Sequence, residues 1–336
     1  MPMLKVLRSA STATLLAGAL AFAASSLPAQ TTTKSLPEQI ADVMVQLAGG
    51  IHTGLRFTHT KGLVVTGTFT PAASASSISR AVHLQKSPVP VTVRFSDGSG
   101  LPTIPDNNPN ASPHGMAIRF MLPSGAYTDI VANSHNGFFV GNGDDFLALL
   151  KAIAATNEKS PHPSPIEAFL GAHPAALKVV TDSRAAARSF ENLDFYGNNA
   201  FIFVDDAGNK RPGRYQIIPD AGVVKLDSAA SAKQKPDYMF DDLKSAITKG
   251  PIRYTLYVQL ANPGDQTNDG SVVWPSDRKR VKLGSISLNK VAPNNDELQK
   301  TLAFNPIILT NGIMLSDDPL PLLRSAVYAL SVAHRH

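Results

Sequence analysis

The stretch Arg56–Phe69, RFTHTKGLVVTGTF, decides the fold. It places His59 at the start of a predicted strand, three residues after an arginine and three before a glycine. A second stretch near the other end of the chain, Arg324–Tyr328 or RSAVY, puts a phenol four residues after a cation, about one turn of a helix. These two stretches supply the functional groups around which the remaining elements are arranged.

Composition limits the classes of function. The 336 residues, 43% of them hydrophobic, are enough to build one large domain with a proper core. The net charge is +5, but the basic residues are scattered and form no dense or aromatic-interleaved patch, so we predict no nucleic-acid partner. The chain has no cysteine, which excludes disulfides, thiolate metal sites and thiol-based peroxide chemistry.

The first 29 residues have the pattern of a secretory signal peptide. Lys5 and Arg8 precede the uncharged run Ala10–Ala24, and small residues lead up to Ala29. A retained membrane anchor is the alternative, but no basic flank follows the apolar run. We therefore expect cleavage after Ala29, a single domain over residues 30–336, no stable membrane insertion after cleavage, and a periplasmic or secreted mature protein.

The mature chain changes its periodicity several times. Apolar residues recur at helical spacing over 36–47, and short strand-like runs separated by Gly, Pro and Asn follow. The predicted strands are 63–69, 89–95, 115–120, 127–131, 201–204, 215–218 and 253–259; the predicted helices are 36–47, 146–153, 165–169, 175–180, 237–247, 296–302 and 321–333. This order indicates an α+β protein, an antiparallel β-barrel with flanking helices that could enclose a flat cofactor.

Five blocks of sequence, taken in order, resemble the haem catalases, and among them the short catalase-related peroxidases. The blocks are Arg56–Phe69, Val93–Ser96, Asp129–Asn133 with the phenylalanines that follow it, Pro236–Gly250, and Arg324–Arg335. They cover nearly all of the predicted mature chain. The resemblance implies a catalase-like haem fold and haem b as the cofactor.

The resemblance also implies roles for individual residues. Tyr328 would be the axial ligand of the iron, kept as phenolate by the positive charge of Arg324. On the opposite side, His59 as a neutral imidazole would move the peroxide proton, while Ser96 fixes the tautomer of His59. Asn133 would donate from its amide to the bound peroxide.

The cofactor would be held by further residues that the same blocks supply. Arg56, Arg94 and Arg335 would bind the haem propionates, with Arg324 beside the ligand. Three phenylalanines, Phe138, Phe139 and Phe146, would pack on the porphyrin. Taken singly, each phenylalanine reads as a core residue, Tyr328 as a buried helix tyrosine and His59 as a strand-end histidine; the order of the blocks favours the functional interpretation.

The chain departs from the pattern of the large enzymes at several points. Thr58 stands where an apolar valine is usual, which implies a wetter distal side, and His114 stands where arginine is common, which puts a local salt bridge in doubt. The sequence ends eight residues after Tyr328, so we expect no C-terminal flavodoxin-like domain. Neither the tetramer nor bound NADPH is carried over, and we expect a monomer or small homo-oligomer.

These features predict a haem peroxidase. It would reduce hydrogen peroxide or organic hydroperoxides with small organic electron donors through a ferryl intermediate, and its catalase activity would be weak. The alternatives are an efficient small catalase, a haem-binding protein without turnover, and an apolar-ligand barrel. A haem carrier has no use for His59 with Asn133, and an apolar-ligand barrel needs no Arg324–Tyr328 pair.

Overall fold

The computed structural model describes residues 33–183 and 185–335. The predicted signal peptide, residues 1–29, lies outside these described residues. Residues 34–335 of the described chain form one compact unit. No helix among the described residues has both the length and the apolar character needed to cross a bilayer.

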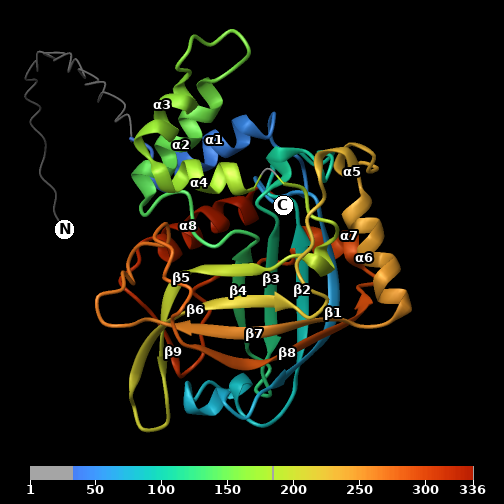
Figure 1. Cartoon of the computed structure of the whole chain (residues 1–336), viewed down its shortest axis with the longest axis vertical. Coiled ribbons are helices and arrows are strands. Elements are labelled where there is room, and N and C mark those ends of the chain that lie inside the picture. Colours follow the sequence, from blue (N-terminus) through green and yellow to red (C-terminus); the bar gives the residue numbers. More distant parts are fainter. Residues whose placement is uncertain (1–32, 184, 336) are drawn as a thin grey trace, which may run out of the picture. The chain divides into compact units, whose positions relative to one another are not determined.

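The helices and strands follow the predicted α+β order (Figure 1). The helices are α1 (Leu36–Leu47), α2 (Gly143–Ala155), α3 (Pro165–Ala172), α4 (Pro174–Asp182), α5 (Ser228–Ala232), α6 (Tyr238–Lys249), α7 (Asn295–Thr301) and α8 (Leu320–Ala333). The strands are β1 (Gly62–Pro71), β2 (Val89–Ser96), β3 (Gly115–Met121), β4 (Tyr127–Asn133), β5 (Phe195–Val204), β6 (Lys210–Pro219), β7 (Ile252–Leu260), β8 (Arg280–Val291) and β9 (Ile313–Leu315).

The strands form an antiparallel barrel. Their order is β4-β3-β2-β1-β8-β7-β6-β5-β9, and a further pairing of β4 with β5 closes the first eight strands into a ring. Closure occurs at the pair Asn133 and Tyr196, while β9 adds to the other half of β5. Closure satisfies the backbone groups that an open sheet would leave at its edges.

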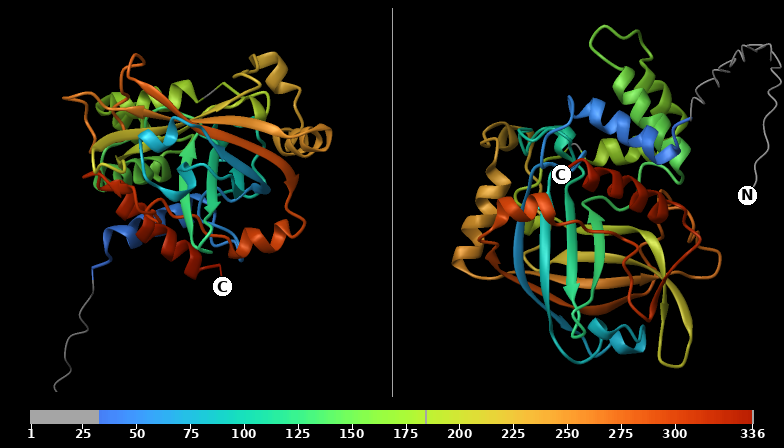
Figure 2. Two further views of the ribbon diagram at one scale, coloured as in Figure 1. Left: turned by 90° about the horizontal axis from the view of Figure 1, so that it is seen from below. Right: turned by 180° about the vertical axis from the view of Figure 1, so that it is seen from behind.

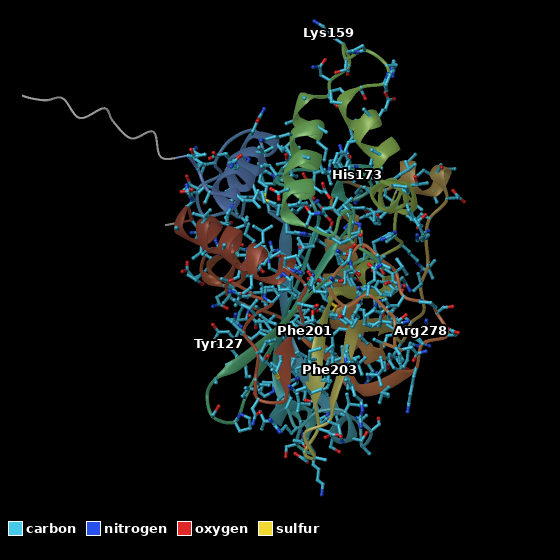
Figure 3. All side chains as sticks on the ribbon, turned by 90° about the vertical axis from the view of Figure 1, so that its left-hand side faces the viewer. Tyr127, Lys159, His173, Phe201, Phe203 and Arg278 are labelled. Carbon is cyan, nitrogen blue, oxygen red and sulfur yellow. The ribbon has the colours of Figure 1, made fainter. Side chains whose placement is uncertain are left out.

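The barrel interior is filled by alternate side chains of each strand. In β2, Val89, Val91, Val93 and Phe95 are all buried, and Phe95 packs against the ring of Tyr254 from β7. Large aromatic residues from several strands complete this core: Phe69, Phe120, Phe195 and Phe203. Figure 3 shows Phe201 and Phe203 within the barrel and His173 among the helices.

Two strands, β8 and β9, were not predicted. In β8 the side chains of Arg280, Lys282 and Lys290 are exposed. Two consecutive residues, Leu283 and Gly284, are both buried, so the alternation of buried and exposed positions is interrupted there. The register of β7 with β8 shifts at the matching point. The bulge breaks the two-residue period, which is why the alternation is weak in the sequence. β9 has three residues, too few to show a period.

The helices α1–α4 and α8 gather at one end of the barrel (Figures 1 and 2). Three of these helices share a hydrophobic cluster that contains Ile40 of α1, Leu147 and Leu150 of α2, and Val327 of α8. Burial of such side chains contributes about 1.5–3 kcal/mol each. This second core fixes α8 in place, and α8 carries Arg324 and Tyr328.

Candidate active site

The strand register aligns several predicted site residues at one end of the barrel. Gly62 of β1 pairs with Ser96 of β2, Ser96 with Gly115 of β3, and Gly115 with Asn133 of β4. Ser96 and Asn133 are therefore two strands apart in one row, with a glycine between them. His59 lies three residues before the start of this row.

His59 has a backbone conformation that is unusual for a residue with a Cβ atom. Among the described residues it is the one non-glycine residue with a positive φ, 53°. Its Nδ1 lies 3.1 Å from Ser96 Oγ. A Cβ atom at Gly115 would lie 2.6 Å from Ser96 Oγ and 2.9 Å from His59 Nδ1, so glycine leaves the space in which these two side chains meet. Strain of this kind clusters at functional sites.

The His59 ring is held neutral. Burial lowers the pKa of its imidazole to about 4, and the positive charges of Arg94 and Arg324 act in the same direction. A hydrogen bond joins the segment that carries His59 to α8, although the two are far apart in the sequence: the Phe57 backbone N–H donates to Ser331 Oγ at 3.3 Å.

Hydrogen bonds to its Oδ1 atom fix the orientation of the Asn133 side chain. Asn133 Oδ1 accepts from the His135 backbone N–H at 3.0 Å and from Asn198 Nδ2 at 3.4 Å. The amide nitrogen of Asn133 has no hydrogen-bond partner within the described chain. The side chain is therefore oriented with its donor end available to a ligand.

On α8, Arg324 and Tyr328 meet as the four-residue spacing predicted. Arg324 Nε and Nη2 donate to Tyr328 Oη at 3.2 Å and 3.1 Å. Arg324 Nη1 donates to Asn199 Oδ1, and Asn199 Nδ2 donates to Asp318 Oδ2 at 2.8 Å. Because a guanidinium only donates, Tyr328 Oη accepts both bonds, and this geometry suits an oxygen that also binds a metal.

Three arginines lie together around Gln299 of α7. Arg94 Nε donates to Gln299 Oε1 at 2.7 Å, and Arg56 Nη1 donates to the Gln299 carbonyl at 2.9 Å. Arg335 shares the Leu302 carbonyl with Arg56. The Gln299 amide in turn donates to the Gly62 carbonyl, which ties the cluster to the first residue of β1.

No carboxylate among the described residues forms an ion pair with this arginine cluster, defined as Arg56, Arg94 and Arg335. Burial, together with the charges of Arg94 and Arg335, lowers the pKa of Arg56 to about 7. Burial and Arg335 likewise lower the pKa of Arg94 to about 9. Arg335 Nε is buried without a hydrogen-bond partner. Uncompensated buried cations are costly, so the cluster fits an anionic group such as a pair of carboxylates.

The predicted aromatic wall is also assembled. The ring centroids of Phe138 and Phe139 are 5.4 Å apart, and those of Phe138 and Phe146 are 5.5 Å apart. All three side chains are half-buried. Half-exposed aromatic rings of this kind fit contact with a flat apolar cofactor.

The structure thus groups the predicted residues into two sets joined through α8. His59, Ser96 and Asn133 form one, and Arg324 with Tyr328 forms the other, with the arginine cluster and the phenylalanines beside them. At His114, where the sequence puts a local salt bridge in doubt, the Nδ1 atom lies 3.0 Å from Asp97 Oδ1. The sequence analysis missed four residues that support these sets: Gly115, Asn199, Gln299 and Asp318.

Replacing Gln299 with leucine tests the organisation of the arginine cluster. The substitution removes the side-chain Oε1 that accepts from buried Arg94 Nε, and an unsatisfied buried donor costs about 1–3 kcal/mol. We expect Gln299→Leu to lower the free energy of unfolding in urea by that amount. The exposed Gln46→Leu on α1 is the control, with a change within about 0.5 kcal/mol. Equal stabilities of the two variants would contradict the role of Gln299.

Comparisons with known proteins agree with this geometry. The family model described as Catalase matches residues 53–336. A catalase-related peroxidase of Mycolicibacterium paratuberculosis (strain ATCC BAA-968 / K-10) is 32% identical over 302 residues, which cover 89% of this chain and 94% of that protein. A catalase-related peroxidase of Synechococcus elongatus (strain ATCC 33912 / PCC 7942 / FACHB-805) is 28% identical and covers 89% and 88%.

Solved catalase structures share the fold. A fungal catalase superimposes with a TM-score of 0.76 at 21% identity, covering 84% of this chain and 60% of that one. Catalase A from Saccharomyces cerevisiae gives a TM-score of 0.74 at 21% identity, covering 84% and 62%. These likenesses confirm the predicted antiparallel barrel with flanking helices. With the family match over most of the sequence, they lead to one conclusion: the chain belongs to the catalase family.

Proposed function

We propose that this member of the catalase family is a haem-dependent peroxidase that reduces hydrogen peroxide or organic hydroperoxides at the expense of small organic electron donors. Membership of the family makes the protein an oxidoreductase that acts on peroxide. The observation that carries the proposal is the pairing of a neutral, Ser96-bonded His59 with the donor end of Asn133. A protein that only carries haem does not need such a pair.

The residues described above fit haem b. Tyr328 would bind the iron, the arginine cluster would neutralise the two propionates, and Phe138, Phe139 and Phe146 would contact the porphyrin. When bound, haem supplies the iron centre that takes up peroxide and exchanges electrons. The double hydrogen bond from Arg324 would hold Tyr328 Oη in place for that ligand role.

The side chains above the haem would move protons. With its hydrogen on Nδ1, donated to Ser96 Oγ, His59 has a lone pair on Nε2. His59 Nε2 would take a proton from the peroxide and return it to the oxygen that leaves as water, and the haem, when bound, would supply the electrons that cleavage of the O–O bond consumes. The Asn133 amide would donate to the peroxide and hold it in position.

The preference for organic donors rests on two observations. Two similar proteins are named catalase-related peroxidases. Thr58, adjacent to His59, is polar where an apolar residue is usual, although its hydroxyl donates to the Gly98 carbonyl at 2.7 Å. We also propose that residues 1–29 are a signal peptide and that the mature protein is periplasmic or secreted, as a monomer or small homo-oligomer.

Following oxygen release and dye oxidation together tests the proposed activity. The protein is isolated from the cell envelope, and an N-terminal sequence that starts at Gln30 would support the proposed signal peptide. The isolated protein is then mixed with hydrogen peroxide, with and without an organic dye donor. We expect dye oxidation with little oxygen release. Fast oxygen release at the same rate with and without the dye would instead identify an efficient small catalase. A protein that contains haem but shows neither oxygen release nor dye oxidation would be a haem-binding protein without turnover.

The pH dependence of the reaction tests the role of His59. Because the pKa of His59 is lowered to about 4, its base form is present above that value, and the peroxide reaction should be level at neutral pH and decline as pH falls through about 4. His59→Ala should keep haem, seen in its absorption spectrum, and lose about 10²–10⁴-fold in the rate of reaction with peroxide. An unchanged rate in this variant would remove His59 from the mechanism.

A further inference from the structure

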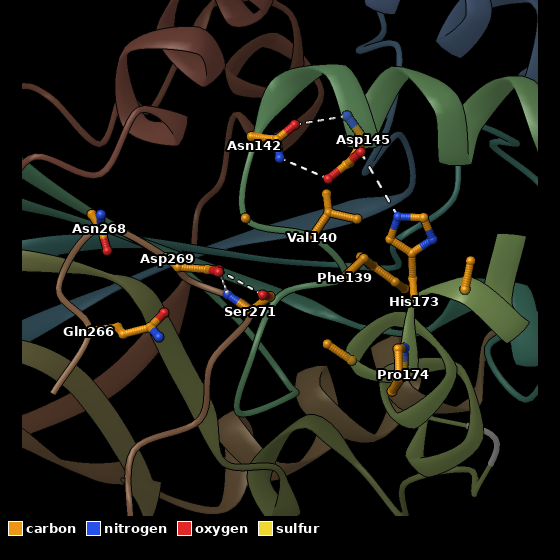
Figure 4. A pocket seen from close by; sticks show the side chains of 13 residues that line it. Phe139, Val140, Asn142, Asp145, His173, Pro174, Gln266, Asn268, Asp269 and Ser271 are labelled. Carbon is orange, nitrogen blue, oxygen red and sulfur yellow. Dashed lines mark hydrogen bonds and ion pairs between the residues drawn. The ribbon is translucent and has the colours of Figure 1, made fainter.

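A cavity of about 420 Å³ lies where the start of α2, the junction of α3 with α4, and the loop 266–271 meet (Figure 4). A volume of this size is within the range of small-molecule sites, about 300–1,000 Å³. The side chains that carry the argument below are Phe139, Asp145, His173 and Asp269, all of which line the cavity. None of them belongs to the proton-moving group of His59 and Asn133.

The cavity shares one wall with the proposed haem site. Phe139 lines the cavity, and its ring lies 5.4 Å from that of Phe138, which in turn lies 5.5 Å from that of Phe146. These three rings are the proposed porphyrin contacts. A molecule in the cavity would therefore contact Phe139, and an electron could pass from it to the proposed haem site through these rings.

The charge of the lining selects the occupant. It contains two carboxylates, Asp145 and Asp269, and no lysine or arginine. Asp269 Oδ1 accepts from the backbone N–H and the hydroxyl of Ser271 at 2.8 Å and 2.6 Å, while Oδ2 has no partner within the described chain. His173 uses Nδ1 on the Phe169 carbonyl at 2.9 Å and directs Nε2 towards Asp145 Oδ1, 3.9 Å away. Available acceptors favour a molecule that donates hydrogen bonds or carries positive charge.

The cavity is held in shape by buried contacts. Arg214 donates to the Asp269 carbonyl at 2.7 Å and to the Val272 carbonyl at 2.5 Å, and its guanidinium stacks 4.2 Å from the ring of Trp274. A Cβ atom at Gly141 would lie 2.5–2.7 Å from the Asp269 carboxylate, so glycine allows this close approach. A loop that is already held in place loses less conformational entropy when a ligand binds.

We propose that this cavity binds the reducing cosubstrate, and that the cosubstrate is a small cationic or neutral aromatic reductant that donates hydrogen bonds. The inference rests on the proposed peroxidase function. Conversion of one hydrogen peroxide to two waters breaks the O–O bond and consumes two electrons and two protons, which two molecules of a one-electron donor supply. Asp269 and Asp145 accept the donor's N–H or O–H groups, and Phe139 contacts its ring.

The test compares two catechols of opposite charge on the resting haem-loaded protein without peroxide. Dopamine is cationic, and 3,4-dihydroxyphenylacetate has the same ring with an anionic chain. By isothermal titration calorimetry we expect dopamine to bind more tightly. Asp269→Asn, which keeps the acceptor to Ser271 and removes the charge, should weaken dopamine binding about tenfold. Ala172→Trp, which fills the cavity, should abolish it.

Asp144→Asn is the matched control for the loss of one negative charge. Asp144 is exposed, precedes the lining residue Asp145 in α2, and does not itself line the cavity. Its dopamine affinity should equal that of the original protein. Equal binding of the two catechols, or dopamine binding unaffected by Asp269→Asn and Ala172→Trp, would overturn the inference. The reaction of the unaltered protein with peroxide is measured separately, so failure of the peroxidase function is seen independently of binding.

Discussion

The feature on which the site depends is a group of three guanidiniums, two buried and one half-buried, that have no carboxylate partner among the described residues. Arg56, Arg94 and Arg335 come from the segment before β1, from β2 and from the residue two after α8, and Gln299 holds them together. The cluster therefore joins the barrel to both C-terminal helices. Carbonyl oxygens satisfy much of its hydrogen bonding but none of its charge. An anionic ligand would complete it, which is why we assign the cluster to the acidic groups of the proposed cofactor.

The same connection aligns the two chemical groups. Ser96, Gly115 and Asn133 form a row across β2, β3 and β4 at one end of these strands. The left-handed backbone conformation of His59 places its side chain beside this row. α8, packed on α1 and α2, brings Arg324 near enough to lower the pKa of His59. The residues proposed for proton transfer and those proposed for metal binding thus lie on separate elements. A rigid barrel on one side and a packed helix on the other hold them in register.

Much of this could be predicted from the sequence, because the signals are local. Period-two runs gave the strands whose alternation is unbroken, and the four-residue spacing gave Arg324 with Tyr328. β8 was missed since its bulge and its lysines hide the period. Gln299 could not be found, because it meets Arg94 across 205 residues and a single glutamine has no pattern. Gly115 shows its purpose only when Ser96 and His59 are seen beside it.

The most direct measurement compares the affinity of the haem-free protein for haem and for haem dimethyl ester by absorbance titration. The ester keeps the iron and the ring and removes both negative charges. If the arginine cluster binds the propionates, the ester should bind at least about tenfold more weakly, since even one lost charge-assisted hydrogen bond is worth that much. Equal affinities would contradict the account, because the three cations would then have another purpose.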